Sequence, residues 1–564
     1  MVTNKLFYSA VIGAALLFAP VKATTYYVSS SGGDSNDGRS PDRPWKTIAY
    51  AVSLLQAGDT AFVKAGDYGS EQITFPRAGS SGRPIVVQGY HTTPRDIPAR
   101  TYAVGDSKLD ASVMPLLSSV PRTGTAITIG RNYVAIKNIQ VVGYRTGVMV
   151  TGNSNTLDNV TAIYQNPDRA LGYYGLAINI QGDYNGLTNC LVADWTVEGL
   201  MLYGDHNTAD SCACYATTSS AQYPHGYYLM AMGSYNTVRK CFSHRVVEMS
   251  HGGHGMGCKA TSQYNTFIDC NIRGFWGDGY MVAHRGCAYN RFIRCVARDG
   301  VGFVVRDSAH DNTFEECRSY NAAYYSNRGA IVTWQSGEDG TIGVGANNLF
   351  VNCIFEKAST MILHLNVSNT ATAFFSSNKF INCNFIGATN FYRTETPSQN
   401  NQFINCVITN ISNISGGGTY GVGYSYANGC FFGNGFAAPT GSGNIAANPL
   451  FVDGTNGDFR LQSHSPCINA GTADLAPSTD LDGNTRPQGQ GYDIGAYEFL
   501  APATPAVSRQ VGVRAVRLES TSVRYFDLRG RQIVRAMSRL PHGVVIEAAT
   551  NPKCVAVLVN GSGH

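Results

Sequence analysis

The six residues Asn265-Thr-Phe-Ile-Asp-Cys270 return as Asn290-Arg-Phe-Ile-Arg-Cys295 and again as Asn312-Thr-Phe-Glu-Glu-Cys317. The same motif also occurs at Asn185–Cys190, Asn207–Cys212, Asn236–Cys241, Asn348–Cys353, Asn378–Cys383 and Asn401–Cys406. Successive motif cysteines are 22, 29, 29, 25, 22, 36, 30 and 23 residues apart. A fixed minimum with variable additions indicates one repeated structural unit that carries loops of different length.

The repeat predicts the coil of a β-solenoid. Its segments alternate apolar and polar residues over short runs and lack a 3.6-residue period, so we expect strands and turns. We expect the Asn in a turn, bonded to the Asn of the next coil. The Cys should point inward and form a column of reduced thiols, because stacked strands hold side chains badly for disulfides. Disulfides or a metal site are the alternatives.

Composition agrees with one elongated unit. The 564 residues include 62 Gly and 32 Tyr, and only 14% are charged, which suits a solenoid better than several compact domains. The net charge of +4 and the lack of a basic run do not suggest a nucleic-acid partner.

The N-terminus has the features of an export signal over residues 1–23. Lys5 precedes an apolar run at Ala10–Ala19, and Val21-Lys-Ala23 offers a cleavage site. The run is too short to cross a bilayer, and no second one follows. We therefore expect a protein that is secreted or on the cell surface, without a membrane span and monomeric.

Two flanking segments resemble a known group of proteins. Thr25-Tyr-Tyr-Val-Ser29 and Pro44-Trp-Lys-Thr-Ile48, within residues 24–95, resemble the N-terminal cap of extracellular pectate-lyase-like β-helix proteins. Asn448-Pro-Leu-Phe451 and Asp493-Ile-Gly-Ala-Tyr-Glu498, within residues 445–500, resemble the closing segment of bacterial proteins of that group. The resemblance implies an all-β, right-handed parallel β-helix over residues 24–500, and polysaccharide lyases above all other activities.

The C-terminus is expected to be a separate small β module. Ala501-Pro-Ala-Thr-Pro-Ala506 begins a linker over residues 501–510. Residues 511–564 contain Tyr525-Phe-Asp-Leu-Arg529 and Leu540-Pro-His-Gly543, and they resemble the sorting tail of some Gram-negative secretion systems. An ordinary small β module is the alternative.

Aligning the repeats predicts which side chains share a face. The anchors are the glycines that open the strand after each variable loop: Gly175, Gly199, Gly226, Gly255, Gly279, Gly302 and Gly329. The residues just before them form a row that contains Tyr174, Glu198, His225, His254, Asp278, Val301 and Arg328. Four to six positions after them lie Tyr203, Met230, Lys259, His284, Arg285, Arg306, Asp307 and Thr333. Long loops beside this strand would wall a groove.

These residue types fit β-elimination of a uronate, which needs a neutralised sugar carboxylate, a base for the C5 proton and an acid for the leaving oxygen. The expected catalytic residues are Lys259, His254, Arg306 and His225, with Lys259 or His254 as the base. Ca²⁺ held by Asp278 or Asp307 is a possible cofactor. The expected substrate contacts are Glu198, Tyr203, Tyr228, His284, Arg285, Arg328 and Trp334. The predicted function is therefore a lyase acting on an acidic polysaccharide.

Other functions stay open at this stage. A glycoside hydrolase needs two carboxylates roughly 6.5–9.5 Å apart, whereas Glu198 and Asp278 fall three coils apart. Gly253-His254-Gly255 resembles one element of polygalacturonases, but the other elements of that family are missing. Glu198, His225, His254 and Asp278 could instead bind a transition metal. A uronate epimerase or a carbohydrate-binding surface protein without catalysis also fits, and the sequence does not identify the polysaccharide.

Overall fold

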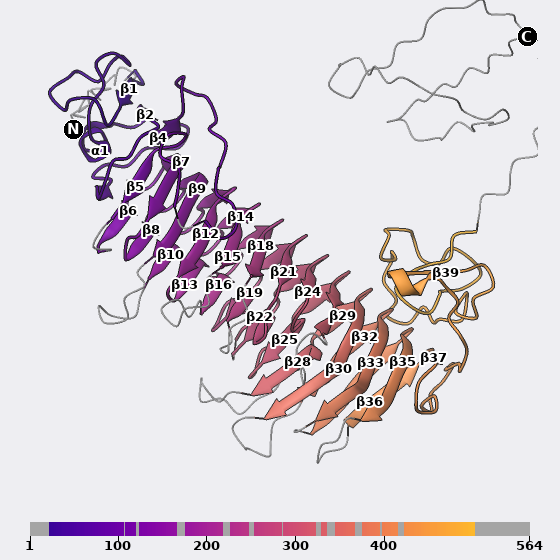
Figure 1. The fold of residues 1–564 in the computed structure, drawn as a ribbon. Coiled ribbons are helices and arrows are strands. Elements are labelled where there is room, and N and C mark those ends of the chain that lie inside the picture. Colours follow the sequence, from indigo (N-terminus) through magenta and orange to yellow (C-terminus); the bar gives the residue numbers. More distant parts are fainter. Residues whose placement is uncertain are drawn as a thin grey trace, which may run out of the picture. The chain divides into compact units, whose positions relative to one another are not determined.

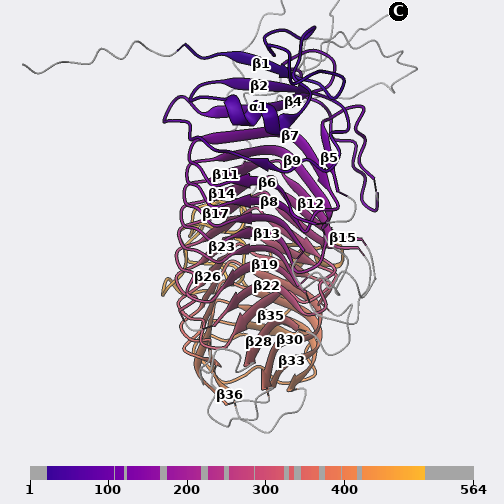
Figure 2. The same cartoon turned by 90° about the vertical axis from the view of Figure 1, so that its left-hand side faces the viewer.

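The protein is a parallel β-helix in the computed structural model (Figure 1). The structure describes residues 22–501, except for residues 107, 120–122, 166–174, 218–225, 247–252, 285, 323–328, 336–344, 367–374, 395–396 and 416–421. Each coil contributes strands to three parallel sheets, and the strands pair in parallel with their counterparts in the next coil (Figure 2). The solenoid predicted from the Asn-to-Cys repeat is confirmed.

The first sheet contains the strand that precedes the Asn-to-Cys motif in each repeat. Its strands are β3 (Ile73–Thr74), β6 (Thr125–Ile129), β8 (Thr146–Val150), β10 (Leu176–Ile180), β13 (Glu198–Leu202), β16 (Tyr227–Ala231), β19 (His254–Lys259), β22 (Asp278–Ala283), β25 (Phe303–Arg306), β28 (Gly329–Gln335) and the second halves of β30 (Ile354–Asn366), β33 (Asn384–Thr394) and β35 (Val407–Ser415).

The second sheet begins in the N-terminal cap and carries the start of each Asn-to-Cys motif. Its strands are β1 (Thr25–Val28), β2 (Thr60–Lys64), β4 (Ile85–Tyr90), the first halves of β7 (Val134–Val142) and β9 (Thr156–Gln165), β11 (Gly186–Thr188), β14 (Thr208–Asp210), β17 (Thr237–Arg239), β20 (Thr266–Ile268), β23 (Arg291–Ile293), β26 (Thr313–Glu315), β29 (Leu349–Val351), β31 (Phe375–Ser376), β32 (Lys379–Ile381), β34 (Ser398–Ile404) and β36 (Val422–Ala427).

The third sheet follows each motif cysteine. Its strands are β5 (Leu116–Ser118), the second halves of β7 and β9, β12 (Leu191–Trp195), β15 (Ala213–Ala216), β18 (Phe242–Arg245), β21 (Asn271–Arg273), β24 (Val296–Arg298), β27 (Arg318–Tyr320), the first halves of β30, β33 and β35, and β37 (Cys430–Phe432).

The motif residues form columns inside the solenoid. Each motif Asn accepts, through its side-chain oxygen, the backbone N–H of the motif Asn in the preceding coil, at 2.7–3.0 Å from Asn185 to Asn401. The apolar position becomes a stack of phenylalanines from Phe267 to Phe403, with centroids 4.6–5.0 Å apart. All fourteen cysteines in the described part of the chain are buried and unpaired. The predicted Asn ladder and reduced thiol column are therefore confirmed.

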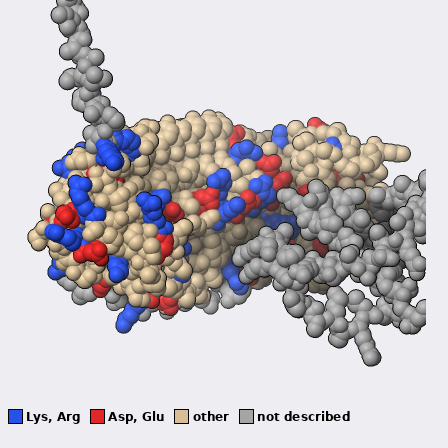
Figure 3. Space-filling view, turned by 90° about the horizontal axis from the view of Figure 1, so that it is seen from above, with Lys and Arg blue, Asp and Glu red and all other residues tan. Residues whose placement is uncertain are grey.

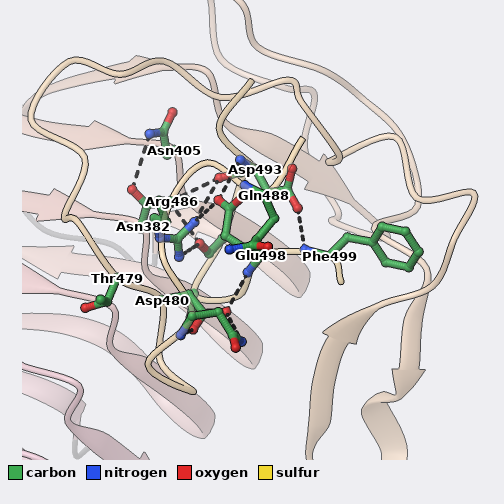
Figure 4. Close-up of polar contacts among 12 residues, drawn as sticks. Asn382, Asn405, Thr479, Asp480, Arg486, Gln488, Asp493, Glu498 and Phe499 are labelled. Carbon is green, nitrogen blue, oxygen red and sulfur yellow. Dashed lines mark hydrogen bonds and ion pairs between the residues drawn. The ribbon is translucent and has the colours of Figure 1, made fainter. Parts of the chain in front are cut away.

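A segment outside the repeat packs against the coils near each end of the solenoid. At the N-terminal end α1 (Ile48–Leu54) is capped by the Thr47 hydroxyl and packs Ile48 and Val52 into the core. At the other end the hairpin of β38 (Phe451–Asp453) and β39 (Asp458–Leu461), with η3 (Gly454–Asn456) between them, precedes a polar cluster (Figure 4). There Arg486 donates to Glu498 at 2.7 Å, and neither side chain is exposed to solvent.

Two exposed ladders run along the outside. Tyr184, His206, Tyr235, Tyr264 and Tyr289 stack on one another at 4.7–5.2 Å in the turns between the first and second sheets, and we call them the outer aromatic stack. Ion pairs of 2.5–2.8 Å join Arg239 to Asp210, Arg273 to Asp299 and Arg291 to Glu315 in neighbouring coils. The face seen in Figure 3 accordingly mixes both signs of charge rather than forming one basic surface.

The two terminal predictions fall outside what can be described. The expected export signal lies almost entirely in residues 1–21, and the expected sorting module lies in residues 502–564, a separate unit of the chain. Within the described ranges, no helix is long and apolar enough to cross a membrane.

Candidate functional site

The first sheet presents its outer side chains in rows because the strands pair without slipping. One row consists of the residues that open consecutive strands: Leu176, Glu198, Tyr227, His254 and Asp278. A second row, at the far end of the strands, contains Lys259, Ala283 and Arg306. Between these rows lies a buried cluster outside the solenoid core, which contains Met201, Met230, Met281 and Val304. The rows thus place ionisable groups at both edges of an apolar strip.

A buried ion cluster joins the two rows on β19, β22 and β25. Nδ1 of His254 lies 2.6 Å from Oδ2 of Asp278, although the ring N–H does not point straight at that oxygen. The same oxygen accepts a hydrogen bond from Nη1 of Arg306 at 3.1 Å. The Asp278 and Arg306 side chains are 2% and 3% exposed, whereas that of His254 is 20% exposed. His254 is therefore the member of this cluster that solvent can reach.

The charges of the cluster determine the ionisation of Asp278. Burial works against its charged form, but His254 and Arg306 outweigh that effect and lower the pKa of Asp278 below its ordinary value. Asp278 is thus a carboxylate that holds His254 and Arg306 in place, rather than a proton donor.

Tyr227 and Lys259 extend the cluster toward β16. The Tyr227 ring stacks on His254 with centroids 4.8 Å apart. Its hydroxyl accepts a hydrogen bond from Nζ of Lys259 at 2.9 Å, and the same ammonium lies 5.3 Å from the ring centroid. Asp278, His254, Tyr227 and Lys259 therefore form one continuous array across three consecutive strands, which we call the central array.

A pocket of about 400 Å³ lies on the coil next to the central array, around Glu198, whose strand β13 pairs with the strand of Tyr227. It is lined by Leu176, Asn179, Gln181, Glu198 and Tyr203. The Glu198 carboxylate accepts hydrogen bonds from the Tyr203 hydroxyl at 2.6 Å and from the Asn179 amide at 2.9 Å. Burial raises the pKa of Glu198, although these two hydrogen bonds oppose the change. The predicted contacts Glu198 and Tyr203 are thus brought together.

The predicted catalytic residues are only partly placed as expected. Lys259 and His254 belong to the central array, and Arg306 adjoins it. Arg306 is only 3% exposed and pairs with Asp278, so its guanidinium does not face the solvent where a substrate would lie. His225, Arg285 and Arg328 lie outside the described residues, as does the side chain of Trp334.

Three expectations need correction. Tyr228 is fully buried in the solenoid core beside Trp195 and Phe275, so it does not contact a substrate, and its neighbour Tyr227 faces outward instead. Met230 lies in the buried strip, away from the row of Lys259. Thr333 points inward, where its hydroxyl lies 2.6 Å from Nδ1 of His364.

The expected metal ligands do not fit a calcium site. Oδ2 of Asp278 is occupied by His254 and Arg306. Asp307 is buried, 3.7 Å from Nδ1 of His284 and 4.0 Å from Nε of Arg306, and His284 is itself only 7% exposed. Calcium prefers six to eight oxygen ligands, and the described residues form no group of three or more His, Cys, Asp or Glu suited to a metal ion. Calcium dependence stays a prediction.

Chemically, the central array can move a proton. His254 is oriented by a carboxylate, and the nearby Tyr227 hydroxyl is held by a cation. These are the parts that a base and an acid require when they act on the same substrate. Glu198 and Asp278 open strands three spacings apart, roughly 14 Å at the usual distance between strands, which is too far for an inverting pair of carboxylates.

Comparison with known families supports the handedness of the fold. The sequence matches the family described as "Right handed beta helix region" over residues 125–276 and 177–337. This match, together with the parallel coils, confirms the predicted right-handed parallel β-helix. An uncharacterized protein of Bacillus subtilis, YwoF, is 28% identical over 137 residues, which cover 21% of this chain and 29% of that protein.

Solved structures with a similar chain path include a pectate lyase, an alginate lyase and a lacto-N-biosidase. Pectate lyase Pel9A is 16% identical, with coverage of 85% of this chain and 97% of that one and a TM-score of 0.33. Alginate lyase AlyGC is 11% identical, with 85% and 60% coverage and a TM-score of 0.45. A lacto-N-biosidase from Eubacterium ramulus is 13% identical, with 71% and 68% coverage and a TM-score of 0.28.

Proposed function

We propose that this chain is an exported polysaccharide lyase that cleaves a uronate-containing glycan by β-elimination at the central array. The observation that carries the proposal is the unbroken contact series from Asp278 through His254 and Tyr227 to Lys259 on neighbouring strands. It combines a base, a hydroxyl acid and a cation within the reach of one sugar unit.

The reaction assigns one task to each group. Lys259 pairs with the sugar carboxylate and makes the adjacent C5–H more acidic. Nε2 of His254, the nitrogen that Asp278 does not hold, takes the C5 proton. The electron pair of that bond forms the C4=C5 double bond, the bond from C4 to the glycosidic oxygen breaks, and the Tyr227 hydroxyl gives its proton to the leaving oxygen. Asp278 and Arg306 position His254 without contacting the sugar.

The experiment is ultraviolet absorbance of reactions with pectate, alginate and glycosaminoglycans, each with calcium and with a chelator. Absorbance from the unsaturated product is expected with at least one of these, and His254→Gln and Lys259→Met should each abolish it. His206→Gln and Lys379→Met, which alter a residue of the outer aromatic stack and a lysine of β32, are the matched controls.

Other outcomes point to other functions. New reducing ends without absorbance would identify a hydrolase and refute the proposal. Exchange of the C5 hydrogen with solvent deuterium, without cleavage, would identify a uronate epimerase, because that reaction shares only the proton abstraction. If no substrate of the panel is cleaved and none exchanges its C5 hydrogen, the lyase proposal is refuted for these substrates and a carbohydrate-binding protein becomes the better interpretation.

A further inference from the structure

A second concave site lies far from the central array, where an excursion leaves the N-terminal coils. Between β4 and β5, residues 91–115 form no helix or strand in the parts that the structure describes, and they run beside the first coils (Figure 1). Connections of this length without secondary structure usually serve a function.

Two side chains, Asp96 and Arg100, make the polar contacts that hold the first part of the excursion in place. Asp96 accepts backbone N–H groups of His91, Thr92 and Thr93 at 2.7–3.0 Å. Arg100 donates through Nε to Thr161 at 3.1 Å and through Nη2 to the Asn159 side chain at 2.9 Å, and Nη2 also contacts the Asn189 carbonyl. Arg100 therefore ties this part of the excursion to the solenoid and forms a wall beside the second sheet.

The space behind that wall is a pocket of about 450 Å³. The excursion contributes Ile97, Pro98 and Arg100, and the solenoid contributes Gln88, Lys137 and Asp158 together with Asn138, Asn159 and Asn189. Gln88, Lys137 and Asp158 stand side by side, because β4, β7 and β9 pair in that register. Among the described residues, none of these three side chains has a hydrogen bond or ion pair.

Three adjacent polar side chains that make no hydrogen bond or ion pair to a described residue, half-buried in one pocket, are available to bind a ligand. Arg100 and Lys137 carry two positive charges and Asp158 one negative charge, so the pocket suits a ligand with a single negative charge. Asp158 and Gln88 can also accept hydrogen bonds from hydroxyls. The volume lies within the usual range for small-ligand sites.

We propose that this pocket is a non-catalytic site for one uronate unit, whose carboxylate pairs with Lys137 and whose hydroxyls bond to Asp158 and Gln88. The charge of the pocket leads to this ligand, so the inference does not require lyase activity. The pocket lies against the second sheet, whereas the central array is on the first. A glycan held here raises the local concentration of substrate at the array without occupying it.

The test is ligand protection of Lys137 from acetylation, read residue by residue by mass spectrometry on the full chain. The ligands are galacturonate and mannuronate, each as a monosaccharide and as a trisaccharide, with cellotriose as the neutral control. His254→Gln protein is used alongside wild type so that turnover does not consume the ligand. Lys379, a half-buried lysine on β32, is the internal control in every sample.

A uronate is expected to slow the acetylation of Lys137 several-fold and to leave Lys379 unchanged, and cellotriose should do neither. Protection by the monosaccharide as well identifies a site for one sugar acid, and protection by the trisaccharide alone identifies a site within a chain. Gln88→Glu keeps the shape of the pocket but adds a negative charge, so it should weaken protection about 10-fold or more, which is the scale of a lost charge-assisted contact.

Two results would overturn the proposal. One is equal acetylation of Lys137 with and without every uronate. The other is protection that Gln88→Glu leaves unchanged, because the ligand would then not meet this wall of the pocket. Protection of Lys137 in a protein without lyase activity would uphold this site and refute the proposed reaction, so failures of the two proposals can be told apart.

Discussion

His254 touches two neighbours through different parts of one ring. The ring edge meets Asp278 and the ring face meets Tyr227, so both the tilt and the rotation of the imidazole are fixed. A histidine held this way needs little reorganisation to receive a proton, and preorganisation of this kind is a main source of enzymatic rate.

Replacing Tyr227 by Phe tests the acid directly. The ring remains to stack on His254, but the hydroxyl that Lys259 contacts is gone. We expect kcat to fall about 10²- to 10⁴-fold, the usual contribution of a positioned acid, with little change in KM. The control is Tyr264→Phe in the outer aromatic stack, and full activity of Tyr227→Phe would exclude Tyr227 as the acid.

Asp278→Asn tests the buried ion cluster. The change removes the nearest counter-charge of Arg306, which is only 3% exposed, and should lower the free energy of unfolding by about 3–5 kcal/mol in urea titrations. Because the pKa of Asp278 is lowered in the folded state, its stabilising effect is present above the ordinary Asp pKa and is lost as the pH falls through the folded value. The difference in free energy of unfolding between wild type and Asp278→Asn should therefore become smaller at acid pH.

A matched substitution separates this effect from surface electrostatics. Asp299→Asn breaks the exposed pair with Arg273 and should cost at most about 1 kcal/mol. Equal losses in the two variants would contradict the buried-cluster interpretation.

Glu198→Gln should show the opposite dependence on pH. The pKa of Glu198 is raised by burial, so ionisation of this carboxyl destabilises the folded protein. Its contribution is fully present below the ordinary Glu pKa and is lost as the pH rises through the folded value. Melting curves from about pH 4 to pH 7 should show wild type losing stability relative to Glu198→Gln. Glu315→Gln, at an exposed position on β26, is the control.

At the scale of elements, the columns explain why the fold was predictable. The motif Asn and Cys recur with fixed spacing, and each makes the contact expected of it with the next coil. The strand register of the first sheet was less predictable, because its glycines follow loops of variable length. Aligning Gly226 with Gly199 pairs Glu198 with His225, whereas in the structure Glu198 pairs with Tyr227, a shift of two residues.

A better signal was present in the sequence. Leu200-Met201 pairs with Leu229-Met230 in the structure, and that shared dipeptide would have placed Tyr227 beside Glu198. The contacts of Arg306 could not be foreseen in the same way. The burial of Arg306 depends on side chains from neighbouring coils, and these cannot be identified from a local sequence pattern.

Phe314→Ala tests the internal stack. The ring lies between Phe292 and Phe350, with centroids 5.0 and 4.6 Å away, and is fully buried. Its loss should cost about 3–5 kcal/mol in denaturant unfolding, because the rigid coils cannot close the cavity. Tyr289→Ala, at the 45% exposed end of the outer aromatic stack, should cost far less. Similar losses of unfolding free energy in the two variants would mean that burial of the ring inside the solenoid adds little stability.

At the scale of the whole molecule, stability is local, because each coil contacts only its neighbours. Arg486→Met in the closing segment leaves Glu498 buried without its partner (Figure 4). We expect faster hydrogen exchange in β29 to β33, because Arg486 and its neighbours bond to Asn352 and Asn382 in the turns of these coils, and unchanged exchange in β10 and β13. Uniformly faster exchange along the solenoid would show that it unfolds as one cooperative unit.

The position of His254 and Asp278 on adjacent coils separates what the fold tolerates from what the chemistry tolerates. A duplicated coil inserted between β19 and β22 could continue every internal column, since the new Asn, Phe and Cys would find the same neighbours. It would nevertheless move the imidazole one strand spacing away from its carboxylate. Solenoids of this kind can therefore change length by whole coils at either side of the central array, while that one boundary between coils has to stay as it is.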